Sequence, residues 1–349
     1  MLISKRFDFN QLPSIILTKE QLDSKREVEK KIKNKKYIFE YFTSCPICNS
    51  KSFEILSKKD RYGFKLNTYI CKTCGIILTN PHFNFESYSK FYDSEYRSLY
   101  SSSKKPTNMF WEAQKKQGKR IWKTLSTIKE MDRKTIVEVG VGAGGILEYF
   151  KQRGNIIFGV DLGKEYISFG KQKGLNLFYG TIDKLISLRI KADVVIYSHV
   201  LEHIIDIKSE LKKIKKILKK NGLLYIELPG VKNLENSYEM DFLKSIQNAH
   251  VYYFTLNTLQ NLLAKENFKL IKGNEKIEAI FIIDPNMNFS LKNDYIITKS
   301  YLNKIEKKQK KSLFNFYDFK IRLINIIINI TIKLGIYDFI SMIYKKLRC

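Results

Sequence analysis

The middle of the chain alternates short apolar runs with longer, charged segments. The apolar runs are residues 135–139, 156–160, 176–179, 193–198 and 222–228, followed by 270–273 and 279–283. Between them lie segments of helical periodicity, such as residues 209–218, which end at Lys219-Lys220-Asn221-Gly222. Alternation of this kind is typical of a mostly parallel sheet covered by helices on both faces. The last two runs lie too close together for a crossover helix, so we expect them to form an antiparallel hairpin at the edge.

The remaining sequence divides the chain into five parts. We predict an N-terminal arm at 1–40, a cysteine module at 41–80, a helical linker or lid at 81–130, the sheet domain at 131–285 and a helical tail at 286–349. The linker carries aromatic residues spaced three and four apart, at Phe85, Tyr88, Phe91, Tyr92, Tyr96 and Tyr100. This spacing fits either a helix packed on its neighbour or a lid whose tyrosines close over a ligand.

A glycine-rich turn follows the first apolar run. Such a strand, turn and helix bring a ligand against bare backbone N–H groups. Gly140, Gly142 and Gly145 fit the dinucleotide-binding spacing, and Asp161 follows about where a ribose-binding acid would stand. Glu138 would repel a pyrophosphate, but it suits a cationic ligand such as a sulfonium or an amine. The turn therefore predicts a nucleoside-type cofactor.

Four of the five cysteines form two C-x-x-C pairs separated by 22 residues, at Cys45, Cys48, Cys71 and Cys74. Four thiolates from two tight turns suit tetrahedral zinc, with iron–sulfur ligation as the alternative. A zinc ion held by four sulfurs has no open position for catalysis, so we assign it a folding role. Paired thiols without a secretory signal predict a cytoplasmic protein.

The chain is strongly basic, with a formal net charge of +27. Only 10 of its 62 basic residues are Arg, and Lys reads phosphates and bases less well, so nucleic acid is the weaker expectation. The basic runs at 212–216 and 307–311 fit solvated helix faces or an anionic membrane surface. In the tail, residues 324–332 are apolar. Lys333 and Asp338 interrupt this apolar stretch, so we expect it to be a poor membrane span. The tail is either an interfacial helix on an anionic membrane or a helix docked on the core or on a second subunit.

Polar residues cluster after the fourth run, where a parallel sheet presents its carboxyl edge beside the glycine turn. They are Ser198, His199, Glu202 and His203. His199 and His203 lie four apart and would share a helix face if a helix begins near Ser198.

These motifs, in this order, make residues 134–284 resemble class I S-adenosylmethionine-dependent methyltransferases. Glu138 to Gly144 is similar to their motif I, and Gly159-Val-Asp161 to their second-strand acid. Gly180-Thr-Ile-Asp183 resembles the adenine-flanking segment, and His199-Val-Leu-Glu202-His203 the signature after the fourth strand. Residues 218–229 and 250–255 resemble later segments. The resemblance implies an α/β fold with a Rossmann-like seven-stranded sheet, joined here to a small zinc ribbon and a helical tail.

The resemblance also implies the ligands. S-adenosylmethionine would lie against Glu138, Gly140, Gly142, Gly144, Asp161, Asp183 and Ser198. Glu138 would lie near the cationic amino-acid end, Asp161 at the ribose, and Asp183 or Ile182 at the adenine. The cysteine module with residues 79–81 and 91–96 is similar to bacterial methyltransferases of sugar and surface-polysaccharide pathways, including zinc-containing sugar C-methyltransferases.

A methyl acceptor with a hydroxyl group needs a base, and histidine suits that work near neutral pH. We take His203 as the first candidate, with His199 and His250 as alternates; the other reading is that His203 only caps or packs a helix. The leading hypothesis is a methyltransferase acting on a nucleotide-linked or lipid-linked sugar. Its competitors are an RNA methyltransferase that holds RNA with the zinc ribbon, and a cofactor-binding scaffold without catalysis. The sequence leaves the oligomeric state open.

Overall fold

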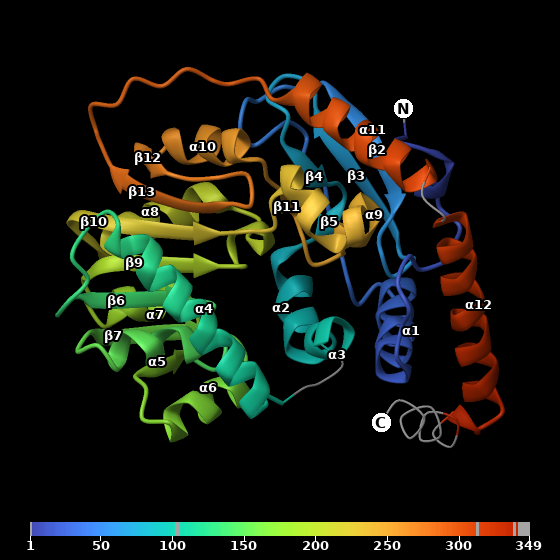
Figure 1. Ribbon diagram of the computed structural model, residues 1–349, viewed down its shortest axis with the longest axis horizontal. Helices are drawn as coiled ribbons and strands as arrows, with labels where there is room; N and C mark the ends of the chain where they lie inside the picture. Colours follow the sequence, from blue (N-terminus) through green and yellow to red (C-terminus); the bar gives the residue numbers. More distant parts are fainter. Residues whose placement is uncertain (1, 102–104, 312–313, 338–339, 341–349) are drawn as a thin grey trace.

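A seven-stranded sheet forms the centre of the computed structural model, which describes residues 2–101, 105–311, 314–337 and 340 (Figure 1). The strand order is β12-β13-β10-β9-β6-β7-β8. The strands are β6 (Thr135–Val139), β7 (Ile156–Asp161), β8 (Leu177–Tyr179), β9 (Ala192–Ser198), β10 (Leu218–Glu227), β12 (Phe268–Lys272) and β13 (Glu278–Ile283). The pairs from β8 to β10 are parallel, whereas β13 runs antiparallel to both β10 and β12. The predicted parallel sheet with an antiparallel edge hairpin is confirmed.

Helices cover both faces of this sheet because alternate strand residues point to opposite sides. Ile136 and Val194 belong to a buried cluster with Trp111 and Ile146, whereas Val137 and Val195 are buried on the opposite face. The helices of the domain are α4 (Asn108–Ser126), α5 (Gly145–Lys151), α6 (Lys164–Gln172), α7 (Ile182–Ser187), α8 (Ile207–Ile217) and α10 (Leu256–Ala264). Helix α8 ends one residue before the predicted boundary, and β10 begins directly at Leu218.

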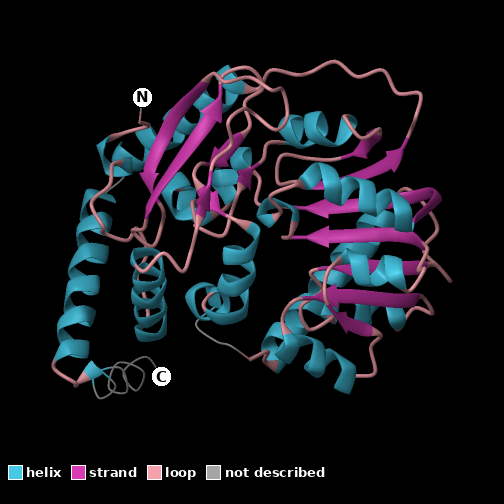
Figure 2. Ribbon diagram, turned by 180° about the vertical axis from the view of Figure 1, so that it is seen from behind, coloured by secondary structure: helices cyan, strands magenta, loops and turns pink. Residues whose placement is uncertain are grey.

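The cysteine module forms a second, smaller sheet that the sequence predicted only in part (Figure 2). Its antiparallel strands are β2 (Phe53–Lys59), β3 (Lys65–Cys71), β4 (Ile77–Thr79) and β11 (Tyr252–Tyr253). A two-residue ladder joins β1 (Phe39–Glu40) to β5 (His82–Phe83). Strand β11 comes from the far end of the sheet domain, so the module is completed by a segment that lies about 170 positions away in the chain. A two-residue strand carries no readable periodicity, which is why the sequence did not predict this pairing.

The segment predicted to be an N-terminal arm, residues 1–40, contains regular secondary structure. It contains η1 (Lys5–Phe7) and α1 (Lys19–Lys33), which begins with a capping box between Thr18 and Gln21. The segment predicted to be helical from Phe83 to Trp122 is three helices: α2 (Phe85–Ser94), α3 (Tyr96–Ser101) and α4. Residues 102–104 lie outside the described part of the chain.

The tail contains α11 (Tyr295–Lys311) and α12 (Phe314–Lys333), with α12 lying alongside the N-terminal part (Figure 1). The Asn325 amide ties them together, donating to Ile15 O at 3.0 Å and accepting from Leu17 N at 3.1 Å. None of the helices formed by the described residues has the length and apolarity that a bilayer crossing requires. Asp338, which we predicted to interrupt a span, and residues 341–349 lie outside the described residues. Short elements complete the chain: η2 (Leu201–His203), η3 (Val231–Asn236), η4 (Tyr238–Met240) and α9 (Phe242–Ser245).

Candidate functional site

The glycine turn between β6 and α5 has a backbone that only glycine adopts readily. Gly140, Gly142 and Gly144 have φ angles of 72°, 55° and 88°. A Cβ atom on Gly140 would lie 2.2 Å from Val200 Cγ2, and one on Gly144 would lie 2.6 Å from Leu175 Cδ1. The predicted turn therefore forms at the carboxyl edge of the sheet, but its backbone N–H groups are not bare. Those of Gly140 and Val141 donate to Val160 O, and that of Gly144 donates to Val141 O.

Asp161 ends β7 and lies directly against this turn. Its Oδ2 accepts a hydrogen bond from Gly142 N at 2.9 Å, and its Oδ1 accepts one from Gly163 N at 2.7 Å. Arg97 of α3 approaches Oδ1 to 3.9 Å. The carboxylate is thereby oriented beside the glycine turn, which is the place that we predicted for a ribose-binding acid.

Glu138 is a buried carboxyl group that forms no ion pair with a cation of the described residues. It is 1% exposed, and its Oε2 has no hydrogen-bond partner among the described residues. Burial, together with the negative charges of Asp161 and Glu227, raises its pKa well above the ordinary value. A cationic ligand would satisfy this group, since an opposite charge favours the ionised form. The glycine turn, Asp161 and Glu138 together fit a nucleoside cofactor that carries positive charge.

Helix α4 covers the glycine turn, and the sequence did not reveal its polar contacts. Gln114 accepts from Gly145 N at 3.2 Å and donates to Val141 O at 3.2 Å. One turn further on, Gln117 donates to Ser198 Oγ at 2.8 Å. Ser198, predicted to meet the cofactor, thus has its hydroxyl engaged by α4. These glutamines carry no motif, so only the packing of α4 on α5 identifies them.

Asp183, predicted to lie at the adenine, is in the first turn of α7. Its side chain is 57% exposed and pairs with Lys213 Nζ at 2.6 Å. The hydrogen bond from Lys213 lowers the pKa of this carboxyl. Ile182, the neighbouring candidate, is fully buried. The role of either residue at a cofactor stays a prediction.

The predicted helix beginning near Ser198 does not form, so His199 and His203 do not share a helix face. His199 adopts a φ of 56°, and only the short η2 follows. Its backbone N–H donates to Glu227 O at 2.8 Å, which continues the β9–β10 pairing and prevents a helical turn. The condition for a shared helix face, a helix that begins near Ser198, is therefore not met.

The three candidate histidines differ in their surroundings. The side chain of His199 is 51% exposed, with Glu202 3.7 Å and Glu227 3.8 Å from its ring nitrogens. Partial burial opposes its charged form, but these two carboxylates outweigh that effect and raise the pKa of His199 to about 10. A protonated imidazolium cannot accept a proton, so His199 is a poor base.

His203 is held as a neutral imidazole. Burial lowers its pKa despite the nearby Glu202. Its Nδ1 lies 2.9 Å from Ala249 O, which assigns the proton to Nδ1 and leaves the lone pair on Nε2. That Nε2 is 3.9 Å from Glu202 Oε1. His203 therefore has the protonation state that a general base needs.

His250 lies behind His203, with ring centroids 4.8 Å apart. It is 3% exposed, and its Nε2 contacts the Gln247 amide. Burial and then the neighbouring His203 and Arg61 lower its pKa well below the ordinary value. The fold therefore joins His203 and His250, which are far apart in sequence, and leaves His199 on the other side of Glu202.

The two halves of the aromatic series lie in different surroundings, and a lid that closes over a ligand stays a prediction. Tyr88 and Phe91 pack in the interior, as in a helix docked on its neighbour. Tyr92 and Tyr96 instead place their rings 5.9 Å from that of His203, and Tyr96 stacks on Tyr100 at 5.6 Å. The second half of the series therefore contacts a candidate catalytic group.

Buried polar atoms without partners are concentrated around these histidines. Among the described residues they include Arg61 Nε, the Tyr92 hydroxyl, both oxygens of Glu202, and both amide atoms of Asn248. Buried polar groups are normally hydrogen-bonded, so a group of unpaired ones indicates a place where a polar ligand binds. We call this group the histidine cluster; its members are Arg61, Tyr92, Glu202, His203, Asn248 and His250.

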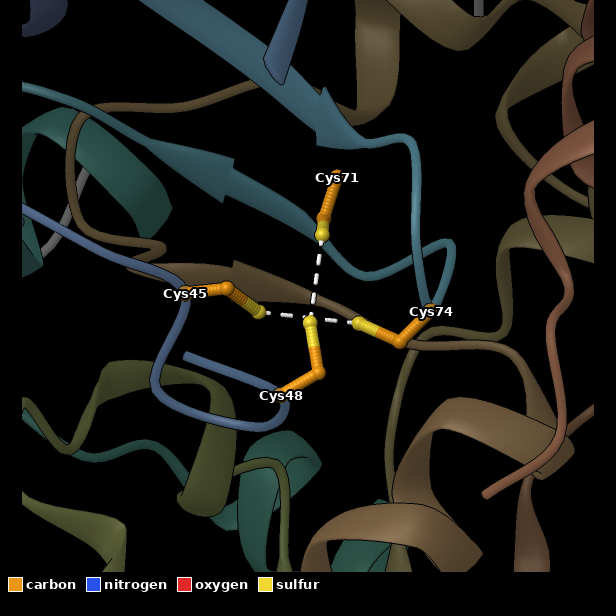
Figure 3. A group of neighbouring side chains, drawn as sticks. All are labelled: Cys45, Cys48, Cys71 and Cys74. Carbon is orange, nitrogen blue, oxygen red and sulfur yellow. Dashed lines mark hydrogen bonds between the residues drawn. The ribbon is translucent and has the colours of Figure 1, made fainter. Parts of the chain in front are cut away.

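The four predicted cysteine ligands converge from two tight turns (Figure 3). Asn49 N donates to Cys45 O, and Gly75 N donates to Cys71 O, both at 2.9 Å. The Sγ atoms of Cys45 and Cys74 are 3.5 Å apart, as are those of Cys48 and Cys71. Zinc–sulfur bonds of about 2.3 Å in a tetrahedron place sulfurs about 3.8 Å apart. The donor set and its spacing are compatible with zinc.

Glu202, His203 and His250 form a second group whose donor atoms lie within 4.8 Å of one another. The distance of 3.9 Å from Glu202 Oε1 to His203 Nε2 exceeds the roughly 3.4 Å that separates oxygen and nitrogen ligands of one tetrahedral zinc ion.

Comparison with known proteins agrees with the fold. Residues 110–272 match a family model described as a methyltransferase domain. This match and the seven-stranded sheet support a methyltransferase domain in this part of the chain, in agreement with the ordered motifs.

Among curated relatives, the chain is 24% identical to the C-methyltransferase NovU of Streptomyces niveus over 66% of this chain and 53% of that protein. It is 27% identical to a ubiquinone biosynthesis O-methyltransferase of Pelagibacter ubique over 30% of this chain and 46% of that protein. The chain thus spans about half the length of these relatives.

A solved structure of a SAM-dependent methyltransferase from Archaeoglobus fulgidus aligns with a TM-score of 0.38 and 20% identity, covering 56% of this chain and 87% of that one. The PH0226 protein from Pyrococcus horikoshii aligns with a TM-score of 0.39 and 16% identity, covering 58% and 97%.

Proposed function

We propose that this protein transfers a methyl group from S-adenosylmethionine to a sugar carried on a nucleotide or a lipid, in the synthesis of a surface polysaccharide. One observation carries the proposal: a buried carboxyl that forms no ion pair with a cation of the described residues, Glu138, lies near the carboxyl edge that also presents the neutral His203. A site for a cationic donor and a site for proton removal thus share one edge of the sheet. The similarity to a C-methyltransferase and an O-methyltransferase supports methyl transfer but leaves the acceptor open.

The donor would be held by the glycine turn and two carboxylates. S-adenosylmethionine supplies an activated methyl group when bound. Glu138 would offset the positive charge of the donor, and Asp161 would accept hydrogen bonds from ribose hydroxyls, each worth roughly 1.5–3 kcal/mol because the acceptor is charged. Alignment of donor and acceptor is then the main contribution of the protein to the rate.

The acceptor would bind in the histidine cluster. His203 Nε2, with its lone pair free, would take the proton from the attacking group of the acceptor, and Glu202 would stabilise the imidazolium that forms. The unpaired Tyr92 hydroxyl and Asn248 amide would hold acceptor hydroxyls. The rings of Tyr92 and Tyr96 would exclude water from this place.

The four cysteines would hold a structural zinc ion. Cys45 and Cys48 lie in the turn before β2, and Cys71 and Cys74 lie at the end of β3 and in the turn after it. Asp294 N, at the start of the tail, donates to Cys74 O at 3.3 Å. The ion would therefore fix the segments that surround the histidine cluster and take no part in the reaction. We place the reaction in the cytoplasm, because zinc-bound thiolates persist in a reducing compartment.

The proposal is tested with a donor that carries an isotope-labelled methyl group. The full chain is incubated with separate host extracts of nucleotide sugars, lipid-linked sugars and RNA, and each product is examined by mass spectrometry. We expect label in a sugar fraction and none in RNA. Label in RNA alone would reject the sugar acceptor and favour the RNA methyltransferase to which the net charge of +27 also points.

A further inference from the structure

We propose that Arg61 binds a phosphate group of the methyl acceptor, so that the histidine cluster selects phosphorylated sugars. This inference rests on the proposed function and deepens it by assigning the anionic part of the substrate to one residue. Arg61 lies in the turn between β2 and β3, on the small sheet and not on the methyltransferase domain.

The backbone of Arg61 is fixed from both sides. Its N–H donates to Ile246 O at 2.9 Å, and its carbonyl accepts from Ser14 N at 2.9 Å. The preceding Asp60 carboxyl accepts from Tyr62 N, Phe64 N and Asn248 N. The guanidinium is therefore presented from a rigid turn that is bonded to the segment leading into His250.

The partners of the guanidinium are all uncharged. It donates to the Tyr62 hydroxyl and, at 2.9 Å, to Gln247 Oε1, and it lies 4.7 Å from the Tyr62 ring and 5.5 Å from that of Tyr100. Within the described residues no carboxylate forms an ion pair with it, and its buried Nε has no partner. Two other half-buried arginines differ, since Arg6 pairs with Asp241 and Arg120 pairs with Glu227, whereas Arg153 donates to Tyr149 O and stacks on the Tyr149 ring.

A largely desolvated cation with neutral partners is costly unless an anion joins it. Guanidinium geometry suits phosphate, which it binds through two parallel hydrogen bonds. The neighbouring Asn248 amide, whose donor is also buried and unpaired, could supply a further hydrogen bond to the same anion.

The position of Arg61 relative to His203 fits a sugar with a phosphate at one end. Gln247 connects the two residues, because it accepts from Arg61 and contacts His250, whose ring is 4.8 Å from that of His203. An acceptor with its phosphate at Arg61 would thus extend toward the candidate base. Three consecutive residues, Tyr238 to Met240, have φ between 51° and 54°, a conformation that L-residues rarely adopt. Such strain accumulates at ligand sites, and the Tyr238 hydroxyl affects the pKa of Arg61.

The test measures the binding of inorganic pyrophosphate, a nucleoside diphosphate and methyl phosphate to the full zinc-loaded chain by calorimetry at 0.15 M salt. We expect Arg61→Gln to weaken pyrophosphate and nucleoside diphosphate at least tenfold. The control is Arg153→Gln, because Arg153 also stacks on aromatic rings, 3.6 Å from that of Tyr149, but lies far from the cluster in the fold. It should bind as the wild type does. Tighter binding of the nucleoside diphosphate than of pyrophosphate would indicate a nucleotide-linked sugar as the acceptor. Equal affinity for the two probes would indicate a lipid-linked sugar.

Equal pyrophosphate affinity in the wild type and in Arg61→Gln would overturn the assignment, since surface lysines would then account for binding. If Arg61→Gln does not fold, phenylglyoxal modification of the wild type replaces it: pyrophosphate should protect Arg61 at least fivefold and leave Arg153 unprotected. Absence of protection would also overturn it. Binding of S-adenosylmethionine is measured in the same samples. If the wild-type protein does not bind S-adenosylmethionine, the proposed function is rejected. If it binds S-adenosylmethionine but Arg61→Gln leaves pyrophosphate affinity unchanged, only the assignment of Arg61 is rejected.

Discussion

Three histidines near one edge of the sheet occupy three electrostatic environments. His199 lies between two carboxylates and stays charged, whereas His203 and His250 are buried and neutral. Sequence spacing could select the three residues but could not rank them, because their ranking depends on Glu227 and on a carbonyl at Ala249 that the fold brings near.

This difference predicts a pH profile and a ranking of variants. His203→Asn should lower kcat by about 100-fold or more, in the range of general-base removal, with donor affinity unchanged. Since the pKa of His203 is lowered, its basic form persists as pH falls, and the wild-type rate should decline only below pH 6.5. His199→Asn should stay within tenfold of the wild-type rate. A wild-type rate that rises between pH 7 and 9 would contradict His203 as the base.

The positive φ of Gly140 and its close approach to Val200 should make substitution at this position costly. Gly140→Ala should abolish donor binding and destabilise the fold by about 1–3 kcal/mol, because its Cβ would meet Val200 at 2.2 Å in a left-handed backbone. Gly154 is the matched control, because its φ is 74° and a Cβ added there would have no atom within 4 Å. Gly154→Ala should cost about 1 kcal/mol and leave donor affinity intact. Chemical denaturation and calorimetry measure both quantities, and equal donor affinity in the two variants would refute the role of the turn.

Elements far apart in the chain build the place where the acceptor is proposed to bind. Side chains of the proposed acceptor site come from five parts of the chain: the β2–β3 turn, α2, α3, η2 and the segment leading to β11. The strands of the large sheet were predictable, because their apolar runs are long and regular. The contribution of Arg61, Gln247 and Asn248 was not predictable, since it depends on the pairing of β11 with β4. This contact joins residues about half the chain apart and leaves no local pattern.

The four paired cysteines predict that the small sheet depends on zinc for its stability. Removing zinc with a strong chelator, or changing Cys45→Ser, should unfold the small sheet and lower the thermal midpoint, because structural zinc binding contributes on the order of 10 kcal/mol to folding. Bound zinc should fall from one per chain to none, and acceptor binding should fail before donor binding does. The control is Cys349→Ser, at a cysteine outside the two pairs. A Cys45→Ser protein with unchanged zinc content would contradict the assignment.

At the scale of the whole molecule, α12 presents an apolar face outward. Leu323, Ile326, Ile327, Ile330 and Leu334 are between 45% and 65% exposed, and they repeat at helical spacing. The opposite face, with Ile321 and Asn325, packs against the N-terminal part. We propose that the outward face lies on an anionic membrane, to which a net charge of +27 and the exposed Lys320 are complementary.

Sedimentation with vesicles tests this proposal. The variant Ile326→Glu/Ile330→Glu should lose most binding to phosphatidylglycerol vesicles and keep its donor affinity. Ile156→Glu, at an equally exposed isoleucine on the large sheet, should bind vesicles as the wild type does. Wild-type protein that ignores the vesicles, or that forms dimers through α12, would reject membrane docking.

A calorimetric titration with S-adenosylmethionine tests whether the glycine turn and Asp161 bind the methyl donor. We expect one site per chain in the wild type, at least tenfold weaker binding in Asp161→Asn, and no change in Asp193→Asn. Asp193 is the matched control because it lies near the start of β9, at the opposite edge of the same sheet, and pairs with Lys219 at 2.8 Å. Absence of donor binding in the wild type, or equal affinity in all three proteins, would show that this edge of the sheet does not bind the donor.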